Sequence, residues 1–559
     1  MNRITPSRRA FYCLIFLIAS IFPTHVQAQM DTNQHIEYLS EINLVGKGQQ
    51  RDVMMLPEIV GTKINAGKKN SLVVLDQVNN VVVNNSMRQI LAKVPGIQIW
   101  ESDGSGIQIG IANRGLSPNR SWEFNIRQNG ADISADPFGY PEAYYNPQMQ
   151  AVQRIQIIRG AGALQYGPQF GGMVNFIMKD GSDINKRFQY EAQQTAGSFG
   201  LFNSYNAVGG ETEKVHYYAF WDHRRGDGFR ENSGFKVNTG YGTYSWKINS
   251  KLKASFEFTH FNYLSQQPGG LTDAQFKLDA SRSFRQRNWF EVIWNIASIN
   301  FDYTINEKSR FNLKTFAMSG ARNSIGFVQP PTIFDTVNTS SLSHNNRRVD
   351  VDQYRNVGLE ARYITDYKIG KSKNSLSAGG RYFRGTTDRF QNGKGDTGFD
   401  YNLDILNSYP TDLDFLTTNV AFFAENIFRF GKNFLVIPGI RMEFINNTAN
   451  GRLNISGNNE LKINDQNKTR QFLLPGIGAE YHIGQTEIYA NYSQAYRPVL
   501  FSDLSGNPTT DIIDQNLKDA KGYNIDLGYR GRVKDYLFFD VSGFVLQYNN
   551  RIGLIAQQN

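Results

Sequence analysis

Residues 154–179, RIQIIRGAGALQYGPQFGGMVNFIMK, decide how this chain is interpreted. The segment begins as a strand at Ile155–Ile158, in which β-branched residues alternate with a polar neighbour. Arg159-Gly160 ends that strand, and glycines at 162, 167, 171 and 172 then predict tight turns and close backbone approaches rather than a helix. A second apolar strand is predicted at Met173–Met178. The segment therefore predicts two strands joined by a glycine-rich connection.

One interpretation of this connection is a dinucleotide-binding turn. A strand followed by Gly160-x-Gly162 has the first two glycines of that fingerprint. The third glycine position is Gln165, however, and Pro168 interrupts the helix that such a turn opens. The pattern disfavours nucleotide binding.

The same segment resembles the plug-domain signature of TonB-dependent outer-membrane receptors, an R-G, a Y-G and a G-G-x-x-N in series. The residues that carry the series are Arg159, Gly160, Tyr166, Gly167, Gly171, Gly172 and Asn175. Three residues separate the Y-G from the G-G, where the family usually has four. Further resemblances to plug motifs lie at Val94–Ile97 and Ala112–Gly115, and Asn491–Pro498 (NYSQAYRP) resembles a barrel-strand motif of the family.

Three other plug segments are similar in wording to the ferric-dicitrate-type branch of the family. They are Arg114–Trp122 (RGLSPNRSW), Asp136–Tyr145 (DPFGYPEAYY) and Gln165–Gly172 (QYGPQFGG). The resemblance implies an N-terminal α+β plug domain inside an antiparallel transmembrane β-barrel. We place the plug at residues 56–181 and the barrel at residues 186–559.

The plug region itself shows six candidate strands and one amphipathic helix. The helix is predicted at Ser86–Lys93, with Asn84 or Asn85 as its N-terminal cap. The strands are predicted at Leu72–Leu75, Ile97–Trp100, Ile107–Ile111, Glu123–Arg127, Ile155–Ile158 and Met173–Met178.

From Phe188 onward, runs of about ten residues alternate apolar and polar side chains, as a transmembrane barrel requires. In one such run Leu252, Ala254, Phe256 and Phe258 alternate with polar neighbours. Residues 261–287 and 324–351 are predicted as long loops, which disfavours a soluble β-helix or sandwich. We count about fifteen strand candidates, whereas the resemblance implies a barrel of about twenty-two. We therefore expect the barrel to be incomplete at its C-terminus, as in a fragment or truncated product.

The N-terminus predicts export. Met1–Ala28 has a basic start, an apolar core and the small-residue cleavage site Val26-Gln27-Ala28, as in a secretory signal peptide. Its removal takes away Arg3, Arg8 and Arg9 and lowers the net charge from +9 by three to +6, with no basic stripe for nucleic acid. The only cysteine, Cys13, lies in the same segment, so the mature chain needs neither a disulfide nor a thiol.

The polar residues 29–55 are predicted as a periplasmic linker. They contain a short alternating segment that could add as a strand to the sheet edge of a partner. The resemblance implies that such a segment is the TonB box, which binds the periplasmic protein TonB. Our candidate is Glu41, Ile42, Asn43, Leu44 and Val45, and the rival is Glu58-Ile59-Val60.

The sequence gives little support to an enzyme. The seven histidines are scattered, without the spacing of a metal site, and there is no G-x-S-x-G nucleophile motif. An outer-membrane hydrolase with a triad built from distant residues is the alternative. We predict no catalytic residues, no direct metal ligands and no resident cofactor, because iron would arrive in the transported chelate.

The resemblance implies that plug loops contact the ligand on the outer side. The candidate ligand contacts are Ser117, Asn119, Arg120, Tyr140, Tyr144 and Tyr145. A guanidinium suits a carboxylate-rich ferric chelate because it donates paired hydrogen bonds. We assign structural roles to Arg114, Gly115, Arg154 and the signature residues named above, and we expect Arg114, Arg154 and Arg159 to pair with barrel carboxylates.

The first hypothesis is therefore a monomeric outer-membrane receptor that binds ferric citrate or a siderophore and imports it with energy from TonB and its ExbB and ExbD partners. Its surroundings would be outer-membrane lipid and lipopolysaccharide. Two alternatives stay open: a receptor of the same fold for cobalamin, another metal complex or an oligosaccharide, and a truncated binding or signalling protein that does not transport.

Overall fold

A computed structural model describes residues 53–78, 82–83, 85–167, 169–456, 459–504, 514, 516–534 and 537–553. The predicted signal peptide and the preferred TonB box, Glu41–Val45, lie outside these residues. All described residues fall within one compact unit. Among them, no helix is long and apolar enough to cross a membrane.

The plug is built on a five-stranded sheet with the strand order β3-β8-β9-β6-β7. Strands β6 and β9 are parallel, and the other neighbours are antiparallel. The central register places Ile155 opposite Phe176 and Ile157 opposite Val174, and all four side chains are fully buried. The strand bounds are β3 Asn70–Val74, β6 Phe124–Gln128, β7 Ala131–Asp132, β8 Val152–Ile158 and β9 Gly172–Met178.

Two small hairpins complete the strands of the plug. Their strands are β1 Ile59–Val60 with β2 Lys63–Ile64, and β4 Ile97–Glu101 with β5 Ile109–Asn113. The six predicted plug strands are thus confirmed, with ends that move by a few residues.

The predicted helix is present but shorter, as α2 Met87–Leu91. The predicted cap at Asn84 or Asn85 was wrong for Asn85, because Ser86 is the N-cap. Asn85 instead adopts a left-handed backbone (φ 53°), and its side-chain oxygen accepts a hydrogen bond from the Met149 backbone N–H at 2.9 Å. Asn84 lies outside the described residues. A tertiary contact therefore takes the side chain that the local pattern assigns to the helix end.

The glycine-rich connection also differs from its prediction in one respect. A short 3-10 helix, η4 Gly160–Gln165, follows β8, where turns without a helix were predicted. The expected close approach is found at Gly172, which has φ 91° and leaves no room for a Cβ beside the Ile158 carbonyl oxygen. Glycine at 172 is required by both backbone conformation and space.

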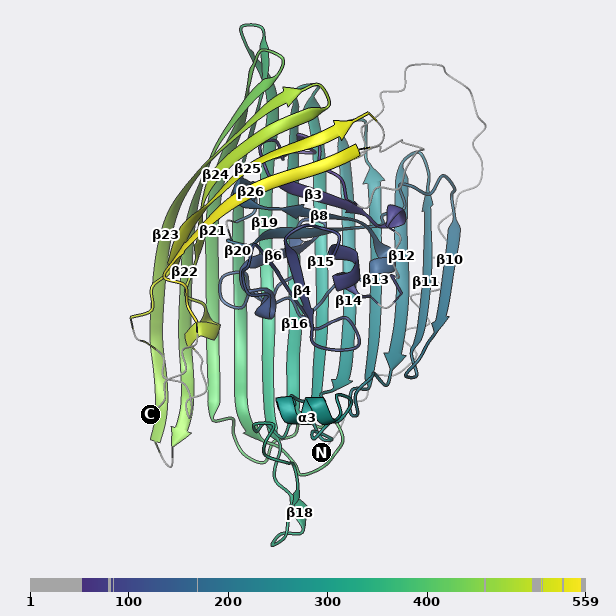
Figure 1. Ribbon diagram of the computed structural model, residues 1–559, viewed down its shortest axis with the longest axis vertical. Coiled ribbons are helices and arrows are strands. Elements are labelled where there is room, and N and C mark those ends of the chain that lie inside the picture. The colour runs from purple at the N-terminus through teal and green to yellow at the C-terminus, as the bar shows by residue number, and fades with distance from the viewer. Residues whose placement is uncertain are drawn as a thin grey trace. The chain divides into compact units, whose positions relative to one another are not determined.

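In the part of the chain from β10 onward that the structure describes, the strands form a fifteen-stranded antiparallel sheet, in agreement with the prediction of about fifteen (Figure 1). Each strand pairs with its neighbour in sequence, apart from the hairpin β17–β18, and β10 and β26 stand at the two ends of the order. The strands are β10 Gln189–Ala196, β11 Phe202–Glu211, β12 Val215–Gly226, β13 Phe235–Lys247, β14 Leu252–Gln266, β15 Trp289–Asn306, β16 Ser309–Gly326, β19 Arg348–Ile369, β20 Ser372–Lys394, β21 Thr411–Phe430, β22 Phe434–Ser456, β23 Asn459–Ile483, β24 Thr486–Arg497, β25 Ala520–Val533 and β26 Leu537–Asn549.

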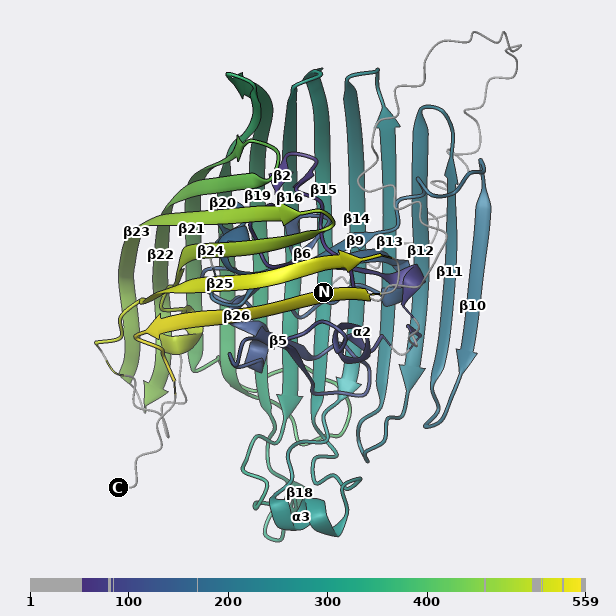
Figure 2. The same cartoon turned by 45° about the horizontal axis from the view of Figure 1, so that its top comes forward.

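The two faces of this sheet have opposite chemistry. On β25, the apolar Ile525 and Leu527 are exposed, whereas Asn524, Asp526 and Arg530 on the other face are buried. The plug lies against that polar face, and both views show the dark plug elements there, with β25 and β26 in front of them in Figure 2. An apolar outer face and a polar inner face are the pattern of a membrane barrel.

The two rims of the sheet, where successive strands are connected, also differ. At one rim the connections are short turns, such as residues 307–308, 370–371 and 484–485. At the other rim they are longer loops: residues 267–288, which include α3 Asp273–Leu278, and residues 327–347, which include the hairpin β17 Val337–Asn338 and β18 Ser343–His344. These loops are shorter than predicted because β14, β16 and β19 extend further along their alternating sequences. In membrane barrels the short turns face the periplasm and the long loops face the outside.

Candidate functional site

A cavity of about 380 Å³ lies between the plug and the long-loop ends of β15, β16, β19 and β20. The plug contributes the loop after β5 and the loop that contains Tyr140 and Tyr144. The sheet contributes Phe290, Arg322, Arg348, Asp350, Asp352, Arg389 and Gln391. Four of the six predicted ligand contacts, Asn119, Arg120, Tyr140 and Tyr144, are brought together here.

Arg120 is the most exposed cationic side chain in the cavity, at 53%. It lies in the 3-10 turn η2 Asn119–Ser121, and its backbone is left-handed (φ 55°). The turn is held over β5 because the Ser121 hydroxyl accepts the Ile111 N–H at 2.9 Å. Arg120 Nη1 donates to Glu142 Oε1 at 3.1 Å, and this carboxylate raises the pKa of Arg120 above its usual value. The guanidinium is thus positioned by one carboxylate and open to a ligand.

The sheet adds three more arginines to the cavity wall. Arg322 and Arg389 approach Asp352 at 3.4 and 3.7 Å, and Arg348 Nε donates to Asp350 at 2.8 Å. With Arg120 and Glu142, the lining has four cations and three anions, an excess of one positive charge. Low-dielectric walls strengthen the attraction of such a site for an anion. The cavity can therefore hold a ligand rich in carboxylates.

The predicted tyrosines behave differently from one another. Tyr140 lines the cavity, with the Arg389 guanidinium 5.2 Å from its ring centre. Tyr144 is stacked on Tyr354, and its hydroxyl donates to Glu142. Tyr145 was wrongly included among the ligand contacts.

The Tyr145 side chain is fully buried in the hydrophobic core, and its hydroxyl donates to Gln128 Oε1 at 2.9 Å. It points into the core, whereas its neighbour Tyr144 lines the cavity. Ser117 does not line the cavity either; its hydroxyl accepts the Asn119 N–H at 3.3 Å and shapes the loop.

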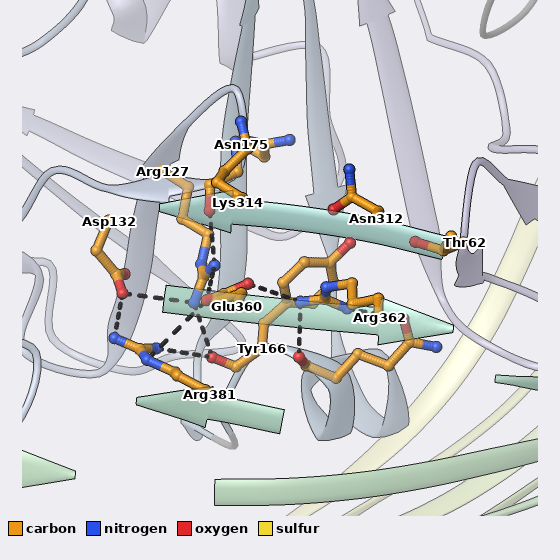
Figure 3. A network of polar contacts seen from close by, with 12 residues as sticks. Thr62, Arg127, Asp132, Tyr166, Asn175, Asn312, Lys314, Glu360, Arg362 and Arg381 are labelled. Carbon is orange, nitrogen blue, oxygen red and sulfur yellow. Dashed lines mark hydrogen bonds and ion pairs between the residues drawn. The ribbon is translucent and has the colours of Figure 1, made fainter. Parts of the chain in front are cut away.

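A second cluster of charges, here called the anchor, joins the plug to the sheet. It consists of Arg127 and Asp132 of the plug with Glu360, Arg362 and Arg381 of β19 and β20 (Figure 3). Arg127 Nη1 donates to Glu360 Oε1 at 2.8 Å, and Arg362 Nη2 donates to Glu360 Oε2 at 3.0 Å. Arg381 donates to Asp132. Every side chain of the anchor is at most 7% exposed.

Tyr166 of the plug signature completes the anchor. Its carbonyl oxygen accepts from Arg127 at 3.0 Å, and its ring lies under the guanidinium of Arg362 at 4.7 Å. Burial alone would lower the pKa of Arg127, but Asp132 and Glu360 raise it more, so the net shift is upward. The anchor thus keeps its charges by pairing them, as buried ions require.

Sequence reasoning missed the anchor. Arg127 ends the predicted strand Glu123–Arg127, in which alternate residues are apolar, and that context hides the ion pair. The signal that could have found it is a charged residue in a strand whose neighbours are all core residues. Its barrel partner Glu360 lies 233 residues away in the sequence, on β19.

Comparison with known protein families decides the identity of the fold. Residues 67–174 match the TonB-dependent Receptor Plug Domain, and residues 176–559 match the family described as TonB dependent receptor-like, beta-barrel. The chain belongs to the TonB-dependent receptor family. This is a family of outer-membrane receptors and transporters, not of enzymes.

Two curated relatives of this receptor are distant. The Rhizobactin receptor of Rhizobium meliloti (strain 1021) is 23% identical, over 92% of this chain and 73% of the relative. The Vitamin B12 transporter BtuB of Vibrio vulnificus (strain CMCP6) is 21% identical over 199 residues, which cover 33% of this chain and 31% of the transporter.

Solved structures confirm the receptor fold. The unliganded ferric citrate transporter FecA has a TM-score of 0.72 at 21% identity, over 87% of this chain and 70% of that one. The Ferric-Catecholate import receptor Fiu from K12 E. coli has a TM-score of 0.67 at 13% identity, over 86% of this chain and 74% of that one.

The signature arginines of this TonB-dependent receptor have different partners. Arg114 pairs with Asp526 of β25, which confirms the predicted barrel carboxylate. Arg159 differs from its prediction, because it donates to Pro95 O at 2.8 Å and Ser71 Oγ at 2.7 Å, both inside the plug. Arg159 directly follows β8, and its guanidinium is occupied by these two acceptors within the plug. Arg154 lies on β8, and its barrel partner stays a prediction.

The remaining signature residues shape the plug backbone. Asn175 is fully buried, and its side chain accepts the Gly130 N–H at 2.8 Å and donates to Gln156 at 3.0 Å. A Cβ at Gly171 would overlap the Glu123 carbonyl oxygen. The other glycines in the set, Gly115, Gly160 and Gly167, have positive φ angles.

The rival TonB box is part of the folded plug. Ile59–Val60 pair with Lys63–Ile64 in the first hairpin, and Val60 is buried. The side chain of Glu58 accepts a hydrogen bond from Arg429 of β21 at 2.8 Å. This segment has its hydrogen bonds inside the receptor and is not an available strand for a partner.

Proposed function

We propose that this receptor binds an anionic ferric chelate, ferric citrate or a carboxylate-bearing siderophore, and imports it with energy transmitted by TonB. The observation that carries the proposal is the set of four arginines around one cavity on the long-loop side. Ferric citrate complexes carry negative charge and several carboxylates, which guanidinium groups bind in pairs. A likeness to ferric chelate receptors supports the same ligand class.

The cavity gives each part of the lining a role in this proposal. Arg120 contributes the exposed guanidinium, and Arg348, at 34% exposure, lines the same cavity from β19. Tyr140 and Tyr144 supply apolar surface with polar tips. The acidic residues position the arginines and keep the empty cavity close to neutral, so that a ligand anion replaces part of their pairing.

Import in this proposal depends on force applied to the plug. TonB would bind Glu41–Val45 as an added strand, and tension would reach the plug through residues 46–57. The anchor around Glu360 resists release of the plug, so the plug has to rearrange against it. No covalent chemistry is involved.

Whole-cell iron uptake tests this proposal. Cells that lack other ferric citrate receptors would express the full chain, or the chain without residues 41–45, and would be given ⁵⁵Fe-citrate. We expect uptake from the full chain that a protonophore abolishes, and surface binding without uptake from the deletion. Deletion of residues 34–38 in the same polar stretch is the matched control and should leave uptake intact.

Two outcomes would change the proposal. Uptake that survives loss of residues 41–45 would overturn Glu41–Val45 as the TonB box. Absence of both binding and uptake of ferric citrate, together with uptake of another cargo such as cobalamin, would overturn the proposed ligand while leaving the fold in place.

A further inference from the structure

A cluster of side chains that can bind a metal lies at the short-turn rim of the sheet, on the side away from the cavity. Glu58 directly precedes β1, and Glu480 and His482 stand near the end of β23. One side-chain ligand atom from each of these three residues lies within 4.8 Å of the other two. The cluster therefore joins the start of the plug to the barrel wall, far along the strands from the cavity.

Two ligand atoms of this cluster are within ion-pair distance of each other, but their geometry is not that of a hydrogen bond. Glu480 Oε2 and His482 Nε2 lie 3.3 Å apart, yet neither makes a hydrogen bond to any described residue. The Glu480 side chain is only 2% exposed, so water does not readily supply the missing partner. Two ligands of a tetrahedral zinc ion, each about 2.1 Å from it, are about 3.4 Å apart. The observed spacing matches that geometry.

The surroundings of His482 fit the same interpretation. Its other ring nitrogen, Nδ1, lies 3.6 Å from Glu487 Oε2 on β24. Metal-bound histidines commonly donate their second N–H to a carboxylate, which fixes the ring and strengthens it as a ligand. Glu487 is held in turn by Arg530.

The charges around the cluster leave room for a cation. Glu58, Glu480 and Glu487 provide three negative charges, and Arg429 and Arg530 provide two positive ones. Glu480 Oε1 is already occupied by the Gly67 N–H at 2.5 Å, which leaves Oε2 as its ligand atom. Glu58 is 41% exposed and can move closer to complete the site.

We propose that Glu58, Glu480 and His482 bind one divalent transition-metal ion of the zinc class, with Glu487 as the hydrogen-bond acceptor for His482. Imidazole and carboxylate ligands suit zinc, and three protein ligands leave the fourth position to water. The bound ion ties residue 58 to β23. If force from TonB arrives through the preceding residues, as in the proposed function, this ion keeps the first residues of the plug attached to β23 until that force is applied.

Zinc binding to the purified, folded full chain in detergent tests the proposal. After treatment with a chelator, Zn²⁺ would be titrated by calorimetry, and Co²⁺ would be added separately to record the visible absorption of a low-coordinate site. We expect one strong site per chain. His482→Ala should raise the Kd for Zn²⁺ at least tenfold and remove the cobalt spectrum. The control is His216→Ala, which changes a histidine beside Asp180 at the same short-turn rim and should alter neither the Kd nor the spectrum.

A second measurement follows the tie itself. Hydrogen exchange of residues 53–60 should slow when Zn²⁺ is added to the wild type and should not respond in Glu58→Gln. Stoichiometric binding that survives in His482→Ala, or the absence of any strong site in the wild type, would overturn the proposal. Because neither readout uses a ferric chelate, failure here is distinct from failure of the proposed transport function.

Discussion

The cavity and the anchor are both built from arginines and carboxylates, but they differ in access to water. Arg120 in the cavity is 53% exposed, whereas Arg127 in the anchor has no exposed side-chain surface. In the anchor, every charge is paired inside the protein, so the cluster fixes the position of the plug. In the cavity, each arginine also has a carboxylate partner, but Arg120 and Arg348 are partly exposed, so a ligand can compete for them. The same residue type therefore holds the plug in one place and recruits a ligand in the other.

The largest effect is expected from breaking the anchor. Glu360→Gln removes the carboxylate shared by Arg127 and Arg362 and leaves buried cations with too few anions. We expect a loss of about 3–5 kcal/mol in the free energy of unfolding. The unfolding midpoint in denaturant and the protease sensitivity of the plug would measure it. The matched control is Asp388→Asn, which breaks an exposed pair with Arg355 and should change stability by less than about 0.5 kcal/mol.

The second prediction concerns Asp136, which lies between the anchor and the cavity along the chain. Burial raises its pKa to about 6, against an ordinary value of 3.8, although the Thr417 hydroxyl partly offsets this. Because the folded pKa is raised, its stabilising contribution is complete below about pH 4 and is lost as the pH rises through 6.

The variant Asp136→Asn stays neutral and should lose less stability between pH 4 and pH 7. At pH 7 it should be more stable than the wild type, by at most about 3 kcal/mol. Unfolding midpoints across this pH range would measure the difference, and Asp404→Asn in an exposed loop is the control. A pH profile of Asp136→Asn that matches the wild type would contradict the raised pKa.

The third prediction concerns the cavity, where we expect a substitution to change ligand affinity and not stability. Arg120→Ala should weaken binding of ferric citrate about tenfold or more, because one charge-assisted pair of hydrogen bonds is lost. Its free energy of unfolding should stay within about 0.5 kcal/mol of the wild type, since the side chain is half exposed. Arg355→Ala, an exposed arginine away from the cavity, is the control for charge. Lost stability with unchanged affinity would return Arg120 to a structural role.

The smallest expected effect is that of ionic strength. Raising salt from about 50 to 500 mM should weaken chelate binding several-fold, because the cavity charges are partly in contact with solvent. The unfolding midpoint should depend much less on salt, since the anchor is buried. Equal sensitivity of the two quantities would remove the distinction between the two regions.

Much of this architecture could be predicted from local patterns. Alternation predicted the membrane strands because the inner and outer faces demand opposite side chains, and glycines such as Gly172 marked the close approach beside Ile158. Helix ends were less predictable, since Asn85 is engaged by Met149 rather than by the helix. Local sequence does not encode such tertiary contacts.

The candidate cavity was predictable only on its plug side. Asn119 and Arg120 lie in a short polar loop that the sequence marks clearly. Arg322, Arg348 and Arg389 lie in long strands with many other polar residues that face inward. Their meeting at one height depends on strand register over the sheet, for which no single strand carries a signal.

The most direct test of the account is a comparison of two ferric chelates of similar size, anionic ferric citrate and a neutral ferric hydroxamate. Their affinities would be measured on the wild type and on the double variant Arg120→Gln/Arg348→Gln. We predict that the wild type prefers ferric citrate by at least tenfold and that the double variant loses most of this preference while its unfolding midpoint is unchanged. Equal or tighter binding of the neutral chelate by the wild type would contradict the account.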